Sequence, residues 1–127
     1  MNPMLAMRQY QQVNTQAQVS EASPHRLIQL LMEGALQRIV QAKGALEHGK
    51  HAQKGLLIGK TISIIGGLHD ALDFKQGGEI ASNLSELYLY MNRRLAEANQ
   101  KNDAAILDEV AQLLRNIKAG WDGIAPV

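Results

Sequence analysis

The stretch from about residue 52 to residue 74 is predicted to be a helix with an unusually wide apolar arc. Steps of four and three keep side chains on one stripe of a helix, and one such stripe contains Ile58, Ile62, Ile65, His69 and Leu72. A second stripe with the same steps lies about 100° away. This second stripe contains Leu57, Thr61, Ile64, Leu68 and Ala71. A bundle helix buries an arc of little more than ~100°, so the surplus needs a cover, which is a fifth helix, a second subunit or a ligand.

The same periodicity predicts three more helices. The first begins at Ser23 and Pro24, because serine caps free amides and proline fits the first helical position, and it runs to about Glu47. Its inward seam is Ile28, Met32, Ala35, Ile39, Ala42 and Leu46. Gly77 and Gly78 end the 52–74 segment.

A third helix is predicted to start at Glu79 and to reach about residue 98, before the pattern breaks at 99–102. Its inward residues are expected to be Ile80, Leu84, Leu87, Met91, Leu95 and Ala98. Asn102 or Asp103 caps a fourth helix that runs to Trp121. The buried side of that helix is expected to be Ile106, Val110, Leu113, Ile117 and Trp121. No segment alternates with period two.

These elements predict an all-α protein, an antiparallel up-and-down four-helix bundle over residues 23–122. Residues 1–22 are expected to form a mobile N-terminal arm or cap, which either forms a short amphipathic helix or stays mobile. They are rich in glutamine and carry apolar Met4, Met7, Tyr10, Val13 and Ala17 at steps of three or four. Residues 123–127 are expected to be a frayed tail.

Four glycines interrupt the 52–74 segment: Gly55, Gly59, Gly66 and Gly67. Each glycine inside a helix costs roughly 1 kcal/mol relative to alanine, so their presence needs a reason. Close approach of another backbone is one. That backbone belongs either to a neighbouring helix of this chain or to a partner, and the sequence leaves both possibilities open.

Composition excludes several classes of function. Thirteen basic and twelve acidic residues leave a net charge of +1, which does not suit a nucleic-acid-binding protein. The chain has no cysteine, and therefore no disulfide framework or thiolate metal site. No secretory signal and no apolar run of the ~20 residues needed to span a bilayer is present. We expect a cytoplasmic protein without membrane insertion.

The sequence contains no motif that indicates catalysis. His48 and His51 have no acidic partner placed to complete a metal site, and His69 is expected to be a core histidine. Serines 63, 82 and 85 have no histidine at a recognised motif spacing. We therefore expect no enzyme activity, no metal, no cofactor and no small-molecule substrate.

Three blocks of sequence resemble the bacterial flagellar secretion chaperone FliS family. They are SPHRLIQLL at 23–31, GGEIASNLSELYLYMNRRL at 77–95, and a closing set of Ala98, Asn99, Asn102, Asp103 and Trp121. The resemblance covers nearly the whole chain. It implies a cytoplasmic helical bundle that binds newly made flagellin, prevents its early polymerisation and presents it to the flagellar export machinery. The implied target is the disordered C-terminal segment of flagellin, and export gate components are the implied second partner.

The candidate site is an apolar groove for that flagellin segment. Its expected residues are Leu57, Ile58, Ile62, Ile65, Leu68, Leu84, Tyr88, Met91 and Leu95. Met7 and Tyr10 are the expected N-terminal cap, because Tyr10 resembles a family tyrosine thought to occupy the groove until flagellin displaces it. Three questions remain open in the sequence: which stripe of 52–74 forms the groove, whether Tyr10 is a permanent part of the fold, and whether an anti-sigma factor or co-chaperone also binds. The alternative function is a homodimeric structural or regulatory bundle without an unfolded client.

Overall fold

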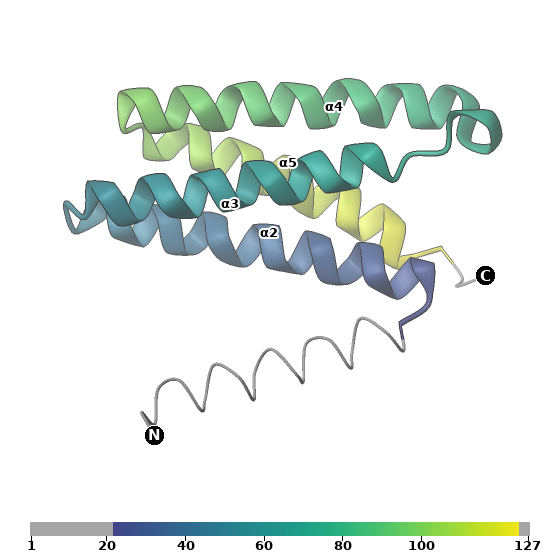
Figure 1. Cartoon of the computed structure of the whole chain (residues 1–127), viewed down its shortest axis with the longest axis horizontal. Helices are drawn as coiled ribbons and strands as arrows, with labels where there is room; N and C mark the ends of the chain where they lie inside the picture. The colour runs from purple at the N-terminus through teal and green to yellow at the C-terminus, as the bar shows by residue number, and fades with distance from the viewer. Residues whose placement is uncertain (1–21, 125–127) are drawn as a thin grey trace.

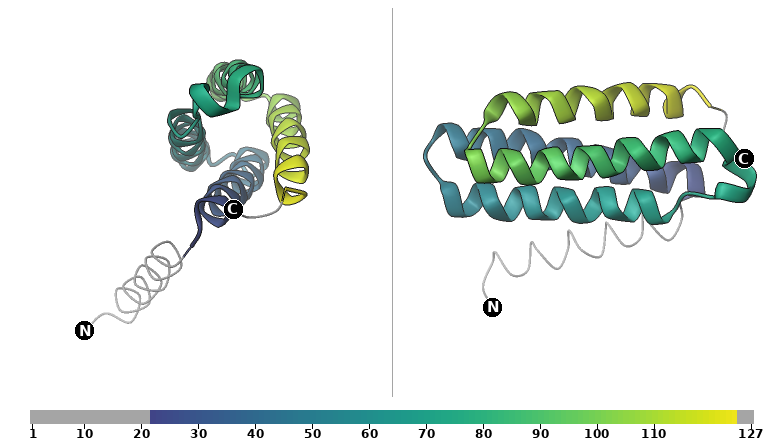
Figure 2. Two further views of the ribbon diagram at one scale, coloured as in Figure 1. Left: turned by 90° about the vertical axis from the view of Figure 1, so that its right-hand side faces the viewer. Right: turned by 90° about the horizontal axis from the view of Figure 1, so that it is seen from above.

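Four α-helices make up the part of the chain that the computed structural model describes, residues 22–124. They are α2 (Pro24–Glu47), α3 (His51–Asp70), α4 (Phe74–Lys101) and α5 (Ala104–Asp122), and consecutive helices run antiparallel (Figure 1). The end view in Figure 2 shows the four helices around one centre, with α2 and α4 each packed between α3 and α5. No strand occurs within these residues. The predicted all-α four-helix bundle is confirmed.

The helix starts follow from their caps. Ser23 accepts a hydrogen bond from the Arg26 amide at 3.1 Å, and Pro24 occupies the first position of α2, as predicted. Asp103 caps α5 by accepting from the Ala105 amide at 2.9 Å. Its neighbour Asn102 instead ends α4 in a left-handed conformation with φ of 53°.

The boundary between α3 and α4 was predicted wrongly. The helix expected to run to Phe74 ends at Asp70, and Phe74 is the first residue of α4. The cause is Asp73, which caps α4 by accepting from the Lys75 and Gln76 amides at 3.0 and 3.1 Å. Gly78 then kinks α4 with φ of 51°, a conformation that glycine adopts without strain, so the long straight part of α4 follows the kink.

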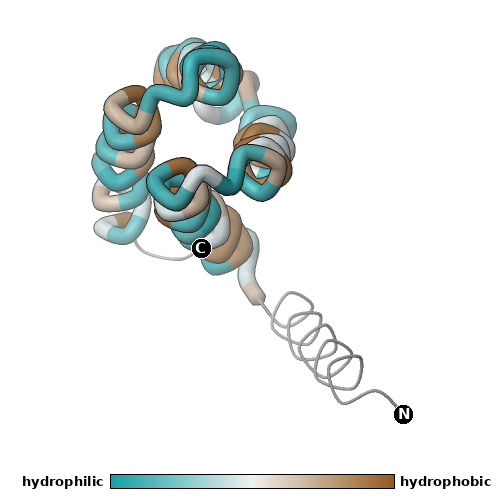
Figure 3. The backbone as a smooth tube through the Cα atoms, turned by 90° about the vertical axis from the view of Figure 1, so that its left-hand side faces the viewer, coloured by the Kyte–Doolittle hydropathy of each residue, from teal (hydrophilic) through white to brown (hydrophobic). Residues whose placement is uncertain are grey.

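In α3 the buried line is neither of the two predicted stripes. Ile58 and Ile65 come from one stripe and Thr61 and Leu68 from the other, so the core faces the seam between them. The flanks of this seam serve the neighbouring helices. The Ile62 carbonyl accepts a hydrogen bond from Asn92 of α4 at 3.3 Å. Both stripes are therefore partly used inside the bundle. Figure 3 shows hydrophobic and hydrophilic positions alternating along the helices.

The inward face of α4 also differs from the prediction. Ile80 and Leu87 were expected in the core, yet they are 71% and 36% exposed. Ala81 and Tyr88, the residues that follow them, are buried instead. Each pair offers two apolar residues about 100° apart on the helix, and periodicity alone does not decide which of the two faces inward.

One end of the bundle is locked by a buried lysine. Lys54 is only 5% exposed, and its Nζ donates to the Asn99 carbonyl at 2.9 Å and to Oδ1 of Asn102 at 2.6 Å. A cation suits this place, because the last carbonyls of α4 form the negative end of its helix dipole. The start of α3 is thereby fixed to the α4–α5 connection.

Candidate binding site

The opposite end of the bundle contains an apolar cleft. It has a volume of about 500 Å³, within the range of about 300–1,000 Å³ found for ligand pockets, and all four helices contribute to it. Its lining residues are Ile28, Met32, Leu68, Ala71, Leu72, Asp73, Gly77, Ile80, Ala81, Leu84, Tyr88, Asn116, Ile117, Gly120, Trp121 and Ile124. We call this feature the apolar cleft.

The course of α5 explains why the cleft exists. Figure 1 shows α5 starting beside the end of α4 and finishing near the start of α2. Because α5 moves away from α4 along its length, the side chains of Ile80 and Leu84 on α4 do not close against Ile117 on α5, and all three line the cleft. Hydrogen bonds hold the end of α5 at α2. The His25 ring nitrogen Nε2 lies 2.9 Å from the Trp121 carbonyl oxygen, and Trp121 Nε1 donates to the His25 carbonyl at 3.0 Å.

The rim of the cleft exposes large apolar side chains to solvent. Ile80 is 71% exposed and Ile124 is 53% exposed, and both line the opening. Phe74, which begins α4 at the same end of the bundle, is 52% exposed. Exposed apolar groups gathered around a hollow are typical of a surface that binds another molecule.

Tyr88 gives the cleft a polar group. Its side chain is 3% exposed and lines the cleft, while its hydroxyl makes no hydrogen bond to any residue in 22–124. Burial raises the pKa of this hydroxyl above its usual value. The phenol therefore stays neutral at physiological pH and can donate a hydrogen bond to a bound backbone.

The structure divides the nine groove residues expected from the sequence. Six lie buried in the core and three are half-buried. The buried six are Ile58, Ile65, Leu68, Tyr88, Met91 and Leu95, and the half-buried three are Leu57, Ile62 and Leu84. Only Leu68, Leu84 and Tyr88 line the apolar cleft. The expected cap residues Met7 and Tyr10 lie outside the described residues.

Sequence reasoning missed much of the cleft. Ile28, Ile80, Ile117 and Trp121 line it, but periodicity assigned all four to the core. Periodicity reports that a residue lies on the apolar side of its helix and says nothing about where two helices move apart. The tryptophan at the end of α5 was the available signal, because a large ring near a helix terminus is well placed to line an opening.

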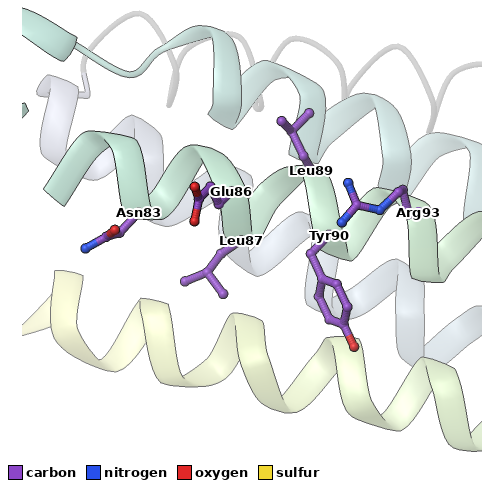
Figure 4. Close-up of a pocket in the computed structure, with 6 residues that line it drawn as sticks. All are labelled: Asn83, Glu86, Leu87, Leu89, Tyr90 and Arg93. Carbon is purple, nitrogen blue, oxygen red and sulfur yellow. The ribbon is translucent and has the colours of Figure 1, made fainter. Parts of the chain in front are cut away.

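Two shallower hollows are more polar. One lies on the outer side of α4 and is lined by Asn83, Glu86, Leu87, Leu89, Tyr90 and Arg93 (Figure 4). Tyr90 points toward α5 there, and its hydroxyl donates to the Glu109 carboxylate at 3.2 Å. The other lies between α2 and α3 and is lined by Arg38, Gly55, Leu56, Gly59, Lys60, Ser63 and Ile64. Charged side chains line both hollows, so the apolar cleft is the better site for an apolar segment.

One arrangement in the structure has a partial likeness to a catalytic triad. His69 Nε2 lies 2.8 Å from Ser85 Oγ, a pairing that motif spacing had not revealed, and His69 Nδ1 lies 3.8 Å from Asp70 Oδ1. The second distance is too long for a hydrogen bond. Ser85 also lies inside α4, where backbone amides are committed to the helix and none is free to stabilise an oxyanion. The pair therefore serves to join α3 to α4.

Two kinds of feature are absent from residues 22–124. No group of three or more His, Asp or Glu side chains there is arranged to hold a metal ion. None of the helices in this region has the length and apolar character required to cross a membrane.

Comparison with known proteins relates the chain to flagellar proteins. Residues 6–127 match the family model described as flagellar protein FliS. The flagellar secretion chaperone FliSB of Pseudomonas aeruginosa is 60% identical over 125 residues, which cover 98% of this chain and 99% of that protein. The flagellar secretion chaperone FliS of Salmonella typhimurium is 48% identical, with 94% and 90% covered. The corresponding Vibrio cholerae protein is 41% identical, with 95% and 89% covered.

Proposed function

Because the chain belongs to the FliS family, we propose that it is a cytoplasmic export chaperone for flagellin. In this proposal it binds the disordered C-terminal segment of flagellin, prevents premature polymerisation and delivers the client to the flagellar export apparatus. The observation that carries the proposal is the apolar cleft, which residues of all four helices line and whose rim residues Ile80 and Ile124 stay exposed in residues 22–124.

The shape and chemistry of the cleft suit such a client. A disordered segment loses conformational entropy when it becomes ordered, so its complex needs a large apolar contact to offset that loss. Ile80, Leu84 and Ile117 supply contacts along the two walls, and an amphipathic helix laid between α4 and α5 would bury them. The Tyr88 hydroxyl, which makes no hydrogen bond to residues 22–124, would donate to a carbonyl of that helix. Binding is therefore non-covalent and is driven by burial of apolar surface.

The N-terminal residues are proposed to cover the cleft when no client is bound. Residues 1–21 join the bundle at Ala22, and Ile28 in the first turns of α2 already lines the cleft. Met7 and Tyr10 are the side chains we propose as the cap. This division makes residues 1–22 an exchangeable arm, 23–122 the bundle and 123–127 a tail.

The central test compares two equally exposed apolar residues. Ile80 at the cleft rim is 71% exposed and Leu56 on the outer face of α3 is 68% exposed, so aspartate at either position should leave the bundle folded. We expect Ile80→Asp to weaken binding of a flagellin C-terminal peptide by at least about tenfold, or about 1.4 kcal/mol. Leu56→Asp should change affinity less than about twofold, which is within the ±0.5 kcal/mol usual for surface changes.

Isothermal titration calorimetry of both variants measures this difference. Equal losses for the two variants would show that the client is not anchored in the cleft. A wild-type protein that ignores the peptide and scatters light as a dimer would instead support the alternative of a homodimeric bundle.

A further inference from the structure

The start of α2 and the end of α5 are joined by a reciprocal contact between His25 and Trp121, which we call the His25–Trp121 clasp. His25 Nε2 lies 2.9 Å from the Trp121 carbonyl oxygen, and Trp121 Nε1 donates to the His25 carbonyl at 3.0 Å. The two rings are also stacked, with centroids 4.9 Å apart and planes 14° apart. Because a carbonyl oxygen only accepts, the hydrogen must sit on Nε2 of His25.

The clasp lies at the wall of the apolar cleft. Trp121 lines the cleft, whereas His25 does not, so His25 supports the wall from behind. The hydrogen bond from Nε1 and the stacking contact hold the indole, and the second hydrogen bond holds the backbone carbonyl of Trp121. Trp121 lies in the last turn of α5, and the last turn of a helix frays most easily. Without these contacts the indole would therefore lose its fixed position.

Polar contacts around the clasp hold the same two helix ends together. Gln29 of α2 donates to Asp122 at 2.8 Å, and Lys118 lies 2.7 Å from Asp122. These groups hold the pKa of Asp122 below its usual value, so it remains charged at neutral pH. They are exposed and therefore contribute little energy. The half-buried contacts of the clasp itself are therefore what hold the indole in position.

We propose that His25 is a positioning residue for client binding: by holding Trp121, it keeps the α5 wall of the apolar cleft in the position that accepts a client segment. This inference rests on the proposed function. It adds that His25 keeps the cleft in its binding conformation without touching the client. Client affinity therefore depends on His25.

The test is His25→Ala in the full chain. Affinity for the flagellin C-terminal peptide should fall about tenfold, because part of the binding energy must then be used to order the wall. Trp121 is the only tryptophan, so its emission in the free protein should also change when the stacked ring and the Nε1 hydrogen bond are lost. His25→Gln keeps a donor near the position of Nε2 and should recover part of the affinity.

His48→Ala is the matched control. His48 also has a ring nitrogen near a backbone carbonyl, with Nδ1 2.7 Å from the Gly44 oxygen, but it lies at the opposite end of α2. Because this contact is exposed and lies within one helix end, His48→Ala should lower the melting temperature no more than His25→Ala does, and it should leave peptide affinity unchanged. Should His25→Ala fail to fold, Trp121→Phe keeps an apolar ring in the wall without the Nε1 donor, and it should still weaken binding of a labelled peptide.

Two outcomes separate this inference from the proposed function. If wild-type protein binds the peptide and His25→Ala, or Trp121→Phe in its place, binds equally tightly, the positioning role is wrong and the function stands. If wild-type protein does not bind the peptide, the proposed function fails. The emission of Trp121 in free His25→Ala protein then still reports whether the clasp holds the indole.

Discussion

Tyr88 connects the core of the protein with its apolar cleft. Its ring is 3% exposed and belongs to the core cluster, and the same residue lines the cleft. The sequence predicted Tyr88 to be a groove residue, and its ring is mostly enclosed by the bundle. The Tyr88 hydroxyl makes no hydrogen bond to residues 22–124. A residue placed in this way supports the fold with most of its atoms and leaves one atom for binding.

The raised pKa of Tyr88 predicts an alkaline limit to stability. Folding favours the neutral phenol, so the unfolded chain, whose tyrosine pKa is about 10, releases its proton first as the pH rises. The stability due to this group is complete below that pH and is lost as the pH rises through the folded pKa. Urea unfolding between about pH 8 and pH 11 should therefore show a steeper loss in wild type than in Tyr88→Phe.

Tyr90→Phe is the control for that measurement. This variant removes the other tyrosine hydroxyl of residues 22–124, which donates to Glu109 at 3.2 Å, and leaves the Tyr88 phenol in place, so the part of the alkaline loss due to Tyr88 should persist. Identical pH profiles for wild type and Tyr88→Phe would contradict the burial of the Tyr88 phenol.

At the level of elements, capping residues and periodicity predict α2 and α5 well and fail at the junction between α3 and α4. Ser23 and Asp103 have the residue types and positions expected of caps, and they start α2 and α5. Asp73 is also a good cap. The prediction instead used the glycine pair after Phe74 as the helix boundary, and it therefore placed the start of α4 several residues too late. A glycine pair marks a break in helical conformation, and here the break is a kink inside α4.

The glycines of α3 are not explained by packing within the bundle. A Cβ at Gly59 or Gly67 would meet nothing within 4 Å among the described residues, and at Gly55 the nearest atom, Oδ1 of Asn99, would be at an ordinary 3.8 Å. The explanation that a neighbouring helix of this chain needs the space therefore has no support in these residues. Close approach of a partner backbone stays a proposal.

Gly59→Ala is predicted to stabilise the protein. Alanine in the interior of a helix is favoured over glycine by roughly 0.5–1 kcal/mol, and no neighbouring atom in residues 22–124 opposes it. Thermal unfolding should show a higher midpoint. Gly78→Ala is the opposite case, because its φ of 51° strains an alanine, and it should lower the midpoint. A midpoint that falls for both would show that α3 is packed more tightly than the structure indicates.

Peptide binding by Gly59→Ala then tests the remaining explanation for the glycines. A backbone of the client or of a second partner lying against α3 would meet the added methyl group, and affinity would fall despite the gain in stability. Unchanged affinity would show that the flagellin segment does not lie against Gly59. That is the result expected if the segment binds in the apolar cleft.

At the scale of the whole molecule, the cleft depends on contacts that no local pattern contains. His25 and Trp121 are 96 residues apart, and the direction of α5 relative to α4 follows from such contacts. The sequence predicted that apolar surface would remain after the bundle had formed. It placed that surface along α3, whereas the structure places the most apolar opening of residues 22–124 where α4 and α5 separate. Global geometry decides where an excess of apolar residues becomes a cleft.

An arm that covers the cleft predicts a gain in client affinity when the arm is weakened. Tyr10→Ala removes most of the apolar area that the proposed cap would bury, so a flagellin peptide would have less to displace. Calorimetry should show affinity equal to or greater than that of wild type. A loss as large as that of the cleft variant Ile80→Asp would mean that Tyr10 contacts the client or supports the fold.

The most direct test of the account is a map of backbone amide chemical shifts during titration with the flagellin C-terminal peptide. The account predicts the largest changes around the apolar cleft, at Ile80, Leu84, Ile117 and the Trp121 indole. Residues at the locked end, near Lys54 and Asn102, should change least. Changes centred on that locked end, or a cleft that gives no response at saturating peptide, would contradict the claim that the cleft holds the client.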